Sequence, residues 1–251
     1  MVRGQYIAGT GMLLQRRLME NITHNITNAD TTGYKKQHLV SHSFDEVMLR
    51  RIRDTHVVGQ TRIVGPLRYG TQVDQVYINF EGGSLEGTER STDFALLGDA
   101  FFVVQTPGGE RYTKCGAFYI DELGYLVDGE GNYLLGENGN LLVGGPNYTV
   151  DELGGIWIAG EYLDRIRVAS FADNGMLRKQ GSNLYDTLEP PEAATKQFRI
   201  MQGYLEISNV DIGREMVDML TVFRTYETNQ RMLTMIDETV GKAVNEIGRL
   251  R

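Results

Sequence analysis

The chain has 251 residues, of which 41% are hydrophobic and 23% charged, so it is long enough for one or two folded domains and is not generally disordered. The longest apolar stretch, residues 94–104, is too short for a membrane-spanning helix, and the N-terminus lacks the pattern of a cleavable signal. The net charge is −8, and residues 66–207 carry 21 Asp and Glu against ten Lys and Arg, which disfavours nucleic acid as a partner. The single cysteine, Cys115, excludes an internal disulfide.

Residues 1–60 form the first predicted segment, which we expect to be helical. Its apolar residues recur at spacings of four and three, interrupted by Gln15: they are Ala8, Met12, Met19, Ile22, Ile26 and Ala29. A second stripe, at Ile7, Leu14 and Leu18, makes the apolar surface wider than one partner helix requires. Asn21, Asn25 and Asn28 share another face, and Thr31 to Gly33 predict the helix end. A shorter amphipathic segment follows over residues 43–53.

Residues 61–207 are predicted to form a β-rich domain with extended connections. Short apolar or alternating runs, such as residues 73–80, 101–105 and 166–171, are separated by turn signals every eight to twelve residues. Residues 66–207 hold 21 of the 30 glycines. Asp128-Gly129 and Asn138-Gly139 are candidate hairpin turns, and Pro190-Pro191 marks an extended connection.

Residues 208–251 contain the strongest periodic pattern in the chain. Apolar residues alternate at spacings of four and three through five heptads, which predicts a coiled-coil helix packing with the N-terminal segment. The predicted seam comprises Ile212, Met216, Met219, Phe223, Tyr226, Gln230, Leu233, Asp237, Val240, Val244 and Ile247. Further apolar residues lie off this seam, among them Val217, Leu220, Met232 and Met235, so we expect intermolecular packing on several sides. The alternative is that both helices pack on the β-rich domain as ordinary core elements.

Several common active-site motifs are missing from the sequence. Neither GxxxxGK[ST] nor GxSxG occurs, which argues against the simplest nucleotide-binding and serine-hydrolase sites. His38 and His42 are spaced like paired metal ligands but have no HExxH context, so we interpret them as solvated. Adjacent acidic pairs, such as Asp121-Glu122 and Asp151-Glu152, are also interpreted as solvated charge. We therefore expect no catalytic residue, cofactor or metal.

Five motifs, in order from end to end of the chain, resemble those of the rod and hook proteins of the bacterial flagellum. They occupy residues 25–35, 98–104, 112–118, 203–211 and 224–227. The residues that carry the resemblance or the helix seam are Asn25, Asn28, Ala29, Thr32, Gly33, Tyr34, Phe101, Phe102, Tyr112, Thr113, Gly116, Phe118, Gly203, Leu205, Glu206, Ser208, Asn209, Val210, Met216, Phe223, Arg224, Tyr226, Glu227, Leu233 and Val240. Ala100 stands where the family usually has glycine, so the turn before Phe101 is expected to differ.

The resemblance implies an α+β fold, in which N- and C-terminal helices form a coiled-coil-like domain beside a β-rich central domain. It implies a structural subunit of the flagellar basal-body rod that is not an enzyme and that polymerises through its terminal helices into a torque-transmitting tube for motility. The implied partners are copies of itself, other rod or hook subunits, and the flagellar type III export apparatus, with no nucleic acid and no membrane insertion. The implied location is the basal body, across the cytoplasmic membrane in the periplasm or cell-wall zone.

Two alternative functions remain. The first is a hook subunit or another member of the same axial family, although the short acidic middle favours a rod protein. The second is a carbohydrate-binding or carbohydrate-acting β-domain protein, in which the acidic β-rich segment alone would bind or cleave glycans. The scarcity of aromatic platforms disfavours this second alternative, since Trp157 is the only tryptophan.

Overall fold

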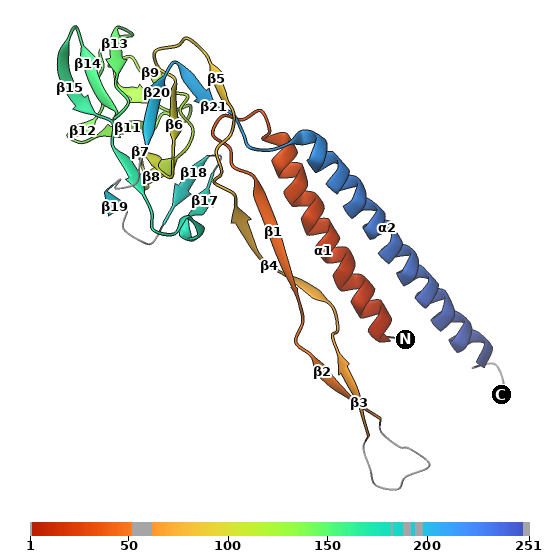
Figure 1. Ribbon diagram of the computed structural model, residues 1–251. Helices are drawn as coiled ribbons and strands as arrows, with labels where there is room; N and C mark the ends of the chain where they lie inside the picture. Colours follow the sequence, from red (N-terminus) through yellow and green to blue (C-terminus); the bar gives the residue numbers. More distant parts are fainter. Residues whose placement is uncertain (1, 52–61, 182, 188–191, 194–197, 248–251) are drawn as a thin grey trace. The chain divides into compact units, whose positions relative to one another are not determined.

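The computed structural model describes residues 2–51, 62–181, 183–187, 192–193 and 198–247, and these residues form two compact units (Figure 1). The helical unit comprises residues 1–26, 37–77 and 212–251. The β-rich unit comprises residues 27–36 and 78–211. The terminal helices and the β-rich centre confirm the predicted α+β class. Residues 62–77 belong to the helical unit, whereas the boundary predicted from the sequence assigned them to the β-rich domain.

The helical unit is built from two helices and a two-part β-ribbon. Its elements are α1 (Val2–Thr27), β1 (Gln37–Ser43), β2 (Val47–Arg51), β3 (Arg62–Leu67), β4 (Thr71–Ile78), α2 (Ile212–Lys242) and a π-helical turn (Ala243–Ile247). In the ribbon β1 pairs with β4, and β2 pairs antiparallel with β3. The helix end predicted at Thr31 to Gly33 lies close to the observed end of α1 at Thr27, but the helical character expected for the rest of residues 1–60 is wrong for β1 and β2. Pairing with β3 and β4 overrides the amphipathic pattern of residues 43–51, and the rest of that segment lies outside the described residues.

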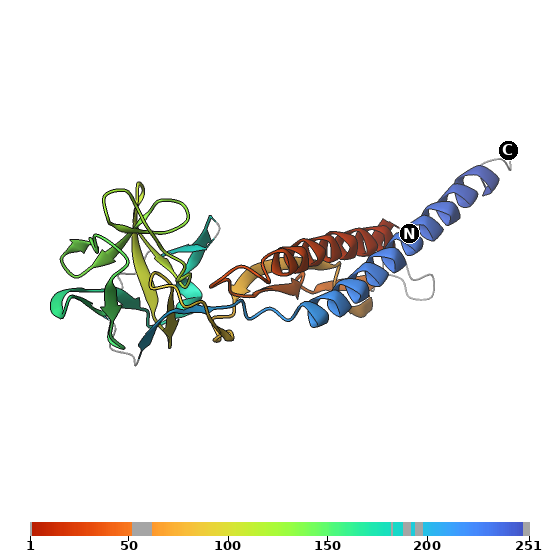
Figure 2. The ribbon, with the colours of Figure 1, turned by 90° about the horizontal axis from the view of Figure 1, so that it is seen from above.

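Helix α1 packs against both α2 and the ribbon (Figures 1 and 2). Small residues on α1 allow α2 to approach closely: a Cβ atom on Gly4 would lie 3.1 Å from Ile236 Cδ1. On the ribbon side, Tyr6 contacts the ring of Phe44 with 6.4 Å between centroids. The two helices thus pack with each other in a unit that also contains β1 to β4.

The face of α2 toward α1 is partly the predicted seam. Its half-buried residues are Met219, Val222, Tyr226, Asn229, Leu233, Ile236 and Val240, again at spacings of three and four. Four of these seven positions also belong to the predicted seam: Met219, Tyr226, Leu233 and Val240. Its other positions within α2, at Ile212, Met216, Phe223, Gln230 and Asp237, are exposed. Neighbouring stripes on one helix satisfy the same spacing, so periodicity could not decide which stripe faces α1.

The β-rich unit contains short antiparallel strands and one 3-10 turn. They are β5 (Leu85–Gly87), β6 (Phe94–Leu97), β7 (Phe101–Thr106), β8 (Gly109–Thr113), β9 (Tyr119–Ile120), β10 (Leu126–Val127), β11 (Tyr133–Gly136), β12 (Gly139–Asn140), β13 (Tyr148–Val150), β14 (Gly155–Ile158), β15 (Glu161–Arg165), β16 (Val168–Ser170), η1 (Asn174–Met176), β17 (Arg178–Gln180), β18 (Leu184–Asp186), β19 (Glu192–Ala193), β20 (Arg199–Gln202) and β21 (Tyr204–Glu206). Among the described strands, the largest sheet has ten members, with the order β17-β18-β8-β7-β11-β10-β9 along its main path. Smaller sheets pair β13-β14-β15, β20-β6 and β21-β5.

Strand β7 separates two hydrophobic clusters. Successive side chains of a strand point to opposite faces, so Phe102 and Val104 enter one cluster while Phe101 and Val103 enter the other. All four are fully buried. Burial on both faces explains why this strand is a continuous apolar run without alternation.

Three turns of the β-rich unit use the same aspartate geometry. Oδ1 of Asp121 accepts hydrogen bonds from the backbone N–H groups of Leu123 and Tyr125, and Asp128 and Asp151 bond residues two and four positions ahead in the same way. The carboxylates of Asp121 and Asp151 therefore shape turns in addition to being solvated. Both predicted hairpins form, although the glycine with positive φ after Asp128 is Gly131.

Candidate assembly site

Asn25 connects three elements of the helical unit. Its Oδ1 accepts from the backbone N–H of Gln37 at 3.0 Å, and its Nδ2 donates to the Gln37 carbonyl at 3.0 Å and to Glu215 Oε2 at 3.1 Å. Asn25 and Glu215 are each about 1% exposed. Because Glu215 lies in the first turn of α2, the helix dipole also favours its charge. This contact fixes α1 against the start of β1 and of α2.

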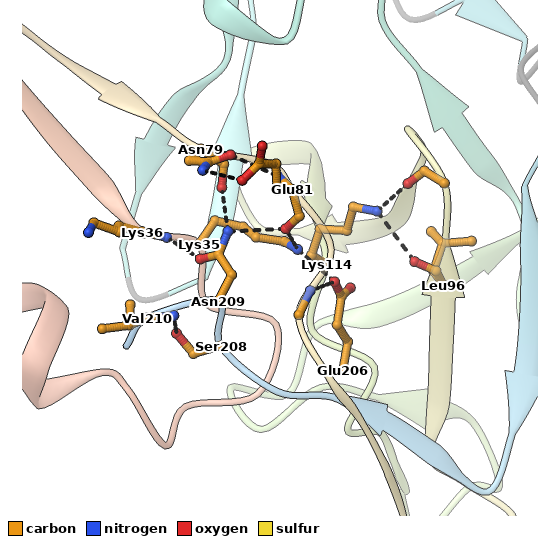
Figure 3. Close-up of polar contacts among 12 residues, drawn as sticks. Lys35, Lys36, Asn79, Glu81, Leu96, Lys114, Glu206, Ser208, Asn209 and Val210 are labelled. Atoms are coloured by element: carbon orange, nitrogen blue, oxygen red, sulfur yellow. Dashed lines mark hydrogen bonds and ion pairs between the residues drawn. The ribbon is translucent and has the colours of Figure 1, made fainter. Parts of the chain in front are cut away.

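A second polar group, the Lys35 cluster, comprises Lys35, Asn79, Glu81, Glu206 and Asn209 in the β-rich unit (Figure 3). Lys35 Nζ lies 2.6 Å from Glu206 Oε1 and donates to the Glu81 carbonyl at 2.8 Å. Both charged side chains are almost fully buried, and Glu206 Oε1 also accepts from the backbone N–H of Gly83. A buried pair needs such additional hydrogen bonds to offset its desolvation.

Asn209 joins the same cluster from the segment before α2. Its Oδ1 accepts from the backbone N–H of Lys36 at 2.8 Å, and its Nδ2 donates to the carbonyls of Asn79 and Glu81. The neighbouring Ser208 accepts from the backbone N–H of Val210. The cluster therefore binds the segments on either side of residues 37–77 to the segment leading to α2.

Three of the five motifs meet in the β-rich unit. The backbone N–H of Gly33 donates to the Glu206 carbonyl at 2.8 Å, and the hydroxyl of Thr32 lies 3.4 Å from Cys115 Sγ. Tyr34 is buried, with Lys179 Nζ 4.2 Å from the centre of its ring. The motif at residues 25–35 therefore packs against those at 112–118 and 203–211.

Two motif glycines stand where no side chain fits. Gly33 has φ of 69°, and a Cβ atom there would lie 2.5 Å from the backbone N of Cys115. A Cβ atom on Gly116 would overlap the carbonyl oxygen of Phe94. Gly203 also has positive φ, at 79°, and its N–H donates to the Asp93 carbonyl. Ala100 shows no such strain: it is buried and its φ is not positive.

The remaining motif residues of the β-rich unit pack in or beside its two hydrophobic clusters. Phe101 and Phe102 occupy opposite faces of β7, Phe118 packs edge-on against Phe102, and Tyr112 packs against Phe171. Burial, followed by the charge of Glu110, raises the pKa of Tyr112. Thr113 Oγ1 donates to the Asn183 carbonyl and accepts from the Cys115 N–H.

Lys114, within the motif at 112–118, is an almost fully buried lysine. Its Nζ donates to the carbonyls of Gly98 at 2.7 Å and Leu96 at 3.4 Å. Burial lowers the pKa of Lys114 to about 8, and the Glu206 charge opposes that decrease. The charges of Glu206 and Asp99 both favour the protonated form of Lys114.

Large apolar side chains remain on the surface of α2. We call them the exposed stripe: Met216, Val217, Leu220, Phe223, Met232 and Met235. Each is at least 49% exposed. They lie in two groups along α2, at residues 216–223 and 232–235. Large exposed apolar patches mark interaction sites in soluble proteins.

An apolar groove of about 670 Å³ also lies between the two helices. Its α1 wall includes Tyr6 and Leu13, and its α2 wall includes Tyr226 and Leu233. Tyr6 and Leu13 are more than half exposed. Contact between α1 and α2 therefore leaves apolar surface on both helices.

The predicted residues thus fall into separate groups. Most residues of the four motifs within 25–211 belong to the Asn25 contact, the Lys35 cluster or the β-core. The predicted residues of α2 differ in exposure. Those exposed are Met216, Phe223 and Arg224, and those half-buried are Tyr226, Glu227, Leu233 and Val240. Asn28, Ala29, Leu205 and Val210 are partly or fully buried within the β-rich unit. The sequence reasoning missed Glu215, whose only signal was an acidic residue in a first helical turn. It also missed Asn79, which has no recognisable motif.

The described residues contain no group of three or more His, Cys, Asp or Glu side chains placed to hold a metal ion. No described helix is long and apolar enough to cross a membrane.

Two protein families match parts of this chain. Residues 95–203 match the family described as flagellar hook protein FlgE/F/G D1 domain, and residues 201–246 match flagellar basal body rod FlgEFG protein C-terminal. The flagellar hook-basal body complex protein FlhO of Bacillus subtilis is 31% identical over 270 residues, covering 100% of both chains. The chain belongs to the flagellar basal-body rod and hook protein family.

Two further members of the family align over almost their whole length. The flagellar basal-body rod protein FlgG of Bacillus subtilis is 29% identical, with 98% of this chain and 99% of FlgG covered. The flagellar basal-body rod protein FlgF of Caulobacter vibrioides is also 29% identical, with 98% of each chain covered. Family membership makes this chain a non-enzymatic structural subunit of the flagellar hook-basal body, and it implies assembly with other rod or hook subunits.

Proposed function

We propose that this chain is a rod subunit that polymerises through α1 and α2 into a torque-transmitting axial tube. The observation that carries the proposal is the exposed stripe of α2, which α1 does not cover. Burying apolar surface contributes about 25 cal/mol per Å², so covering this stripe with neighbouring helices would supply a large driving force for assembly. The partners are copies of this chain and other rod or hook subunits.

Several features suit the helices to this role. The methionines of the exposed stripe have flexible side chains, which adapt to neighbours in slightly different surroundings. The groove between α1 and α2 offers a second apolar surface on the same unit. We extend the proposal to export by the flagellar type III apparatus across the cytoplasmic membrane, which places the tube in the periplasm or cell-wall zone.

A pair of matched substitutions tests the proposal. Phe223→Asp places a charge in the exposed stripe, and we expect it to abolish polymerisation and motility because an unpaired charge would be buried in the helix interface. Leu123→Asp changes an even more exposed apolar residue, at a hairpin turn of the β-rich unit, and is expected to retain both. Electron microscopy of purified protein and swarming of complemented cells report the two outcomes.

Normal polymers from the Phe223→Asp variant would contradict assembly through α2. Loss of polymers in the Leu123→Asp variant alone would assign assembly to the β-rich unit instead. Circular dichroism of both soluble variants checks that helix content is unchanged.

A further inference from the structure

Strands β13, β14 and β15 form a three-stranded sheet of the β-rich unit (Figure 1). Ile156 of the middle strand is fully buried in one hydrophobic cluster. Because successive side chains of a strand point to opposite faces, Trp157 lies on the face away from that cluster. There it is flanked by its cross-strand partners, Thr149 of β13 and Tyr162 of β15. All three side chains are exposed, and we call this side of the sheet the outer face.

The two aromatic rings of the outer face meet at a corner. Their centroids are 5.4 Å apart, and their planes are inclined at 73°. Trp157 is 39% exposed and Tyr162 is 49% exposed, so both rings present surface to solvent. Aromatic rings supply a large apolar contact area with a defined geometry. The corner therefore suits a ligand that has a flat apolar face.

An accessible carboxylate lies beside the indole ring. Trp157 Nε1 donates to Asp151 Oδ2 at 3.4 Å, and Oδ1 of the same carboxylate accepts from the backbone N–H groups of Leu153 and Gly155. A Cβ atom on Gly155 would lie 2.6 Å from Asp151 Oδ2, so the carboxylate covers this glycine on the outer face. Burial opposes ionisation, but the hydrogen bonds and the charge of Arg165 lower the pKa of Asp151. Asp151 is therefore a charged acceptor that is open to a ligand.

A hydrogen-bond donor lies on the same face. Arg165 is the cross-strand partner of Gly155, and directly opposed residues share a face of the sheet. Its side chain is 46% exposed, and Nη1 lies 3.6 Å from Glu137 Oε1. A guanidinium has five N–H groups, so donors remain beyond this ion pair. The outer face thus combines an acceptor, a donor and two rings, and its opposite charges favour a neutral polar ligand over an ion.

A sugar ring has the groups that complement this face. Its C–H bonds form flat apolar faces, and its hydroxyl groups are both donors and acceptors around the rim. We propose that the outer face binds a carbohydrate chain, one ring of which packs against Trp157 and Tyr162 while its hydroxyl groups donate to Asp151 Oδ2 and accept from Arg165. The site is independent of polymerisation, because its residues belong to the β-rich unit and the exposed stripe belongs to α2. A failure of sugar binding therefore leaves the proposed assembly unaffected.

The test is a fluorescence titration of the purified full-length chain, in which Trp157 is the only tryptophan and so reports on this face alone. The probes are the trisaccharides cellotriose, maltotriose and chitotriose. We expect at least one of them to change the emission saturably, with a Kd of about 1 mM. Tyr162→Ala removes one wall of the corner and is expected to weaken binding at least about tenfold. Arg165→Gln removes the donor and is expected to weaken it at least about threefold.

Tyr119→Ala is the matched control, because Tyr119 is 47% exposed in the same unit but belongs to β9 of another sheet. It should leave the Kd unchanged. A cooperative urea transition checks that each variant is folded, and if Tyr162→Ala is not, the Arg165→Gln titration decides. The proposal is overturned if no trisaccharide binds the wild-type chain, if triarginine binds and the trisaccharides do not, or if Tyr162→Ala binds no more weakly than Tyr119→Ala.

Discussion

At the scale of single residues, the motif glycines show how closely separate segments approach one another. Gly116→Ala would place a methyl group on the carbonyl oxygen of Phe94. Phe94 and Leu96 of the same strand belong to the hydrophobic core. We expect a loss of roughly 3 kcal/mol or more in the stability of the β-rich unit, since the backbone itself must move. Urea unfolding followed by Trp157 fluorescence measures it.

Gly129→Ala is the control for that substitution. A Cβ atom on Gly129 would meet nothing within 4 Å, and Gly129 does not have positive φ. We expect a change below about 0.5 kcal/mol, as for other surface positions. Equal effects of the two alanines would refute the steric role assigned to Gly116.

Lys114 predicts an unusual pH dependence at the same scale. Its folded-state pKa of about 8 lies below the roughly 10.4 of an unfolded lysine, so between these values the unfolded chain binds more protons. The destabilisation is therefore full below about pH 8 and is relieved as pH rises toward 10. We expect the β-rich unit to gain about 2 kcal/mol across this window.

Urea midpoints at pH 7.5 and 9.5 test this dependence, with Lys114→Met as the comparison. The variant lacks the titrating group, so its stability should rise less than that of the wild type. A parallel pH response in both proteins would show that Lys114 does not titrate in this range.

The sequence indicated some residues of the polar contacts but not the partners that they bind. The polar face containing Asn25 was recognisable because asparagines recur at helical spacing, but its partners Gln37 and Glu215 are 12 and 190 positions away. Ala100 itself is not strained, because the positive φ of that turn lies at Gly98. Long-range partners of this kind have no local sequence signal.

At the scale of elements, α2 carries two separate apolar stripes, and the predicted heptad seam includes residues of both. Heptad spacing predicted a long helix correctly, but it could not separate the stripe that faces α1 from the exposed stripe. The strand character of residues 37–51 was missed for a related reason: pairing with β3 and β4 decides it, and that pairing is non-local. In contrast, the apolar run at Phe101–Val104 indicated a buried strand directly.

Leu233→Asp tests the packing of the two helices on each other. Leu233 is half-buried and lines the groove with Tyr6 and Leu13, so a carboxylate there would disrupt the contact of α2 with α1. We expect loss of polymerisation and increased proteolysis within residues 1–26 and 212–247, while Trp157 fluorescence of the β-rich unit stays native. Intact polymers from this variant would contradict the groove's role.

At the scale of the whole molecule, the two units differ in how much of their apolar surface they bury. The β-rich unit holds two buried clusters and the convergence of three motifs, whereas the helical unit exposes much of its apolar surface. Sequence composition predicted this contrast between terminal helices and a glycine-rich centre. It did not predict that residues 27–36 belong to the β-rich unit, because the Lys35–Glu206 pair spans 171 positions.

Hydrogen–deuterium exchange of the full chain before and after polymerisation tests the central claim most directly. Uncovered helices should exchange rapidly in the monomer, and neighbouring subunits should protect them in the polymer. We predict a large gain of protection in α1 and α2 and little change in β7, β8 and β11. Equal protection of α2 in monomer and polymer, with new protection confined to the β-rich unit, would contradict assembly through the terminal helices.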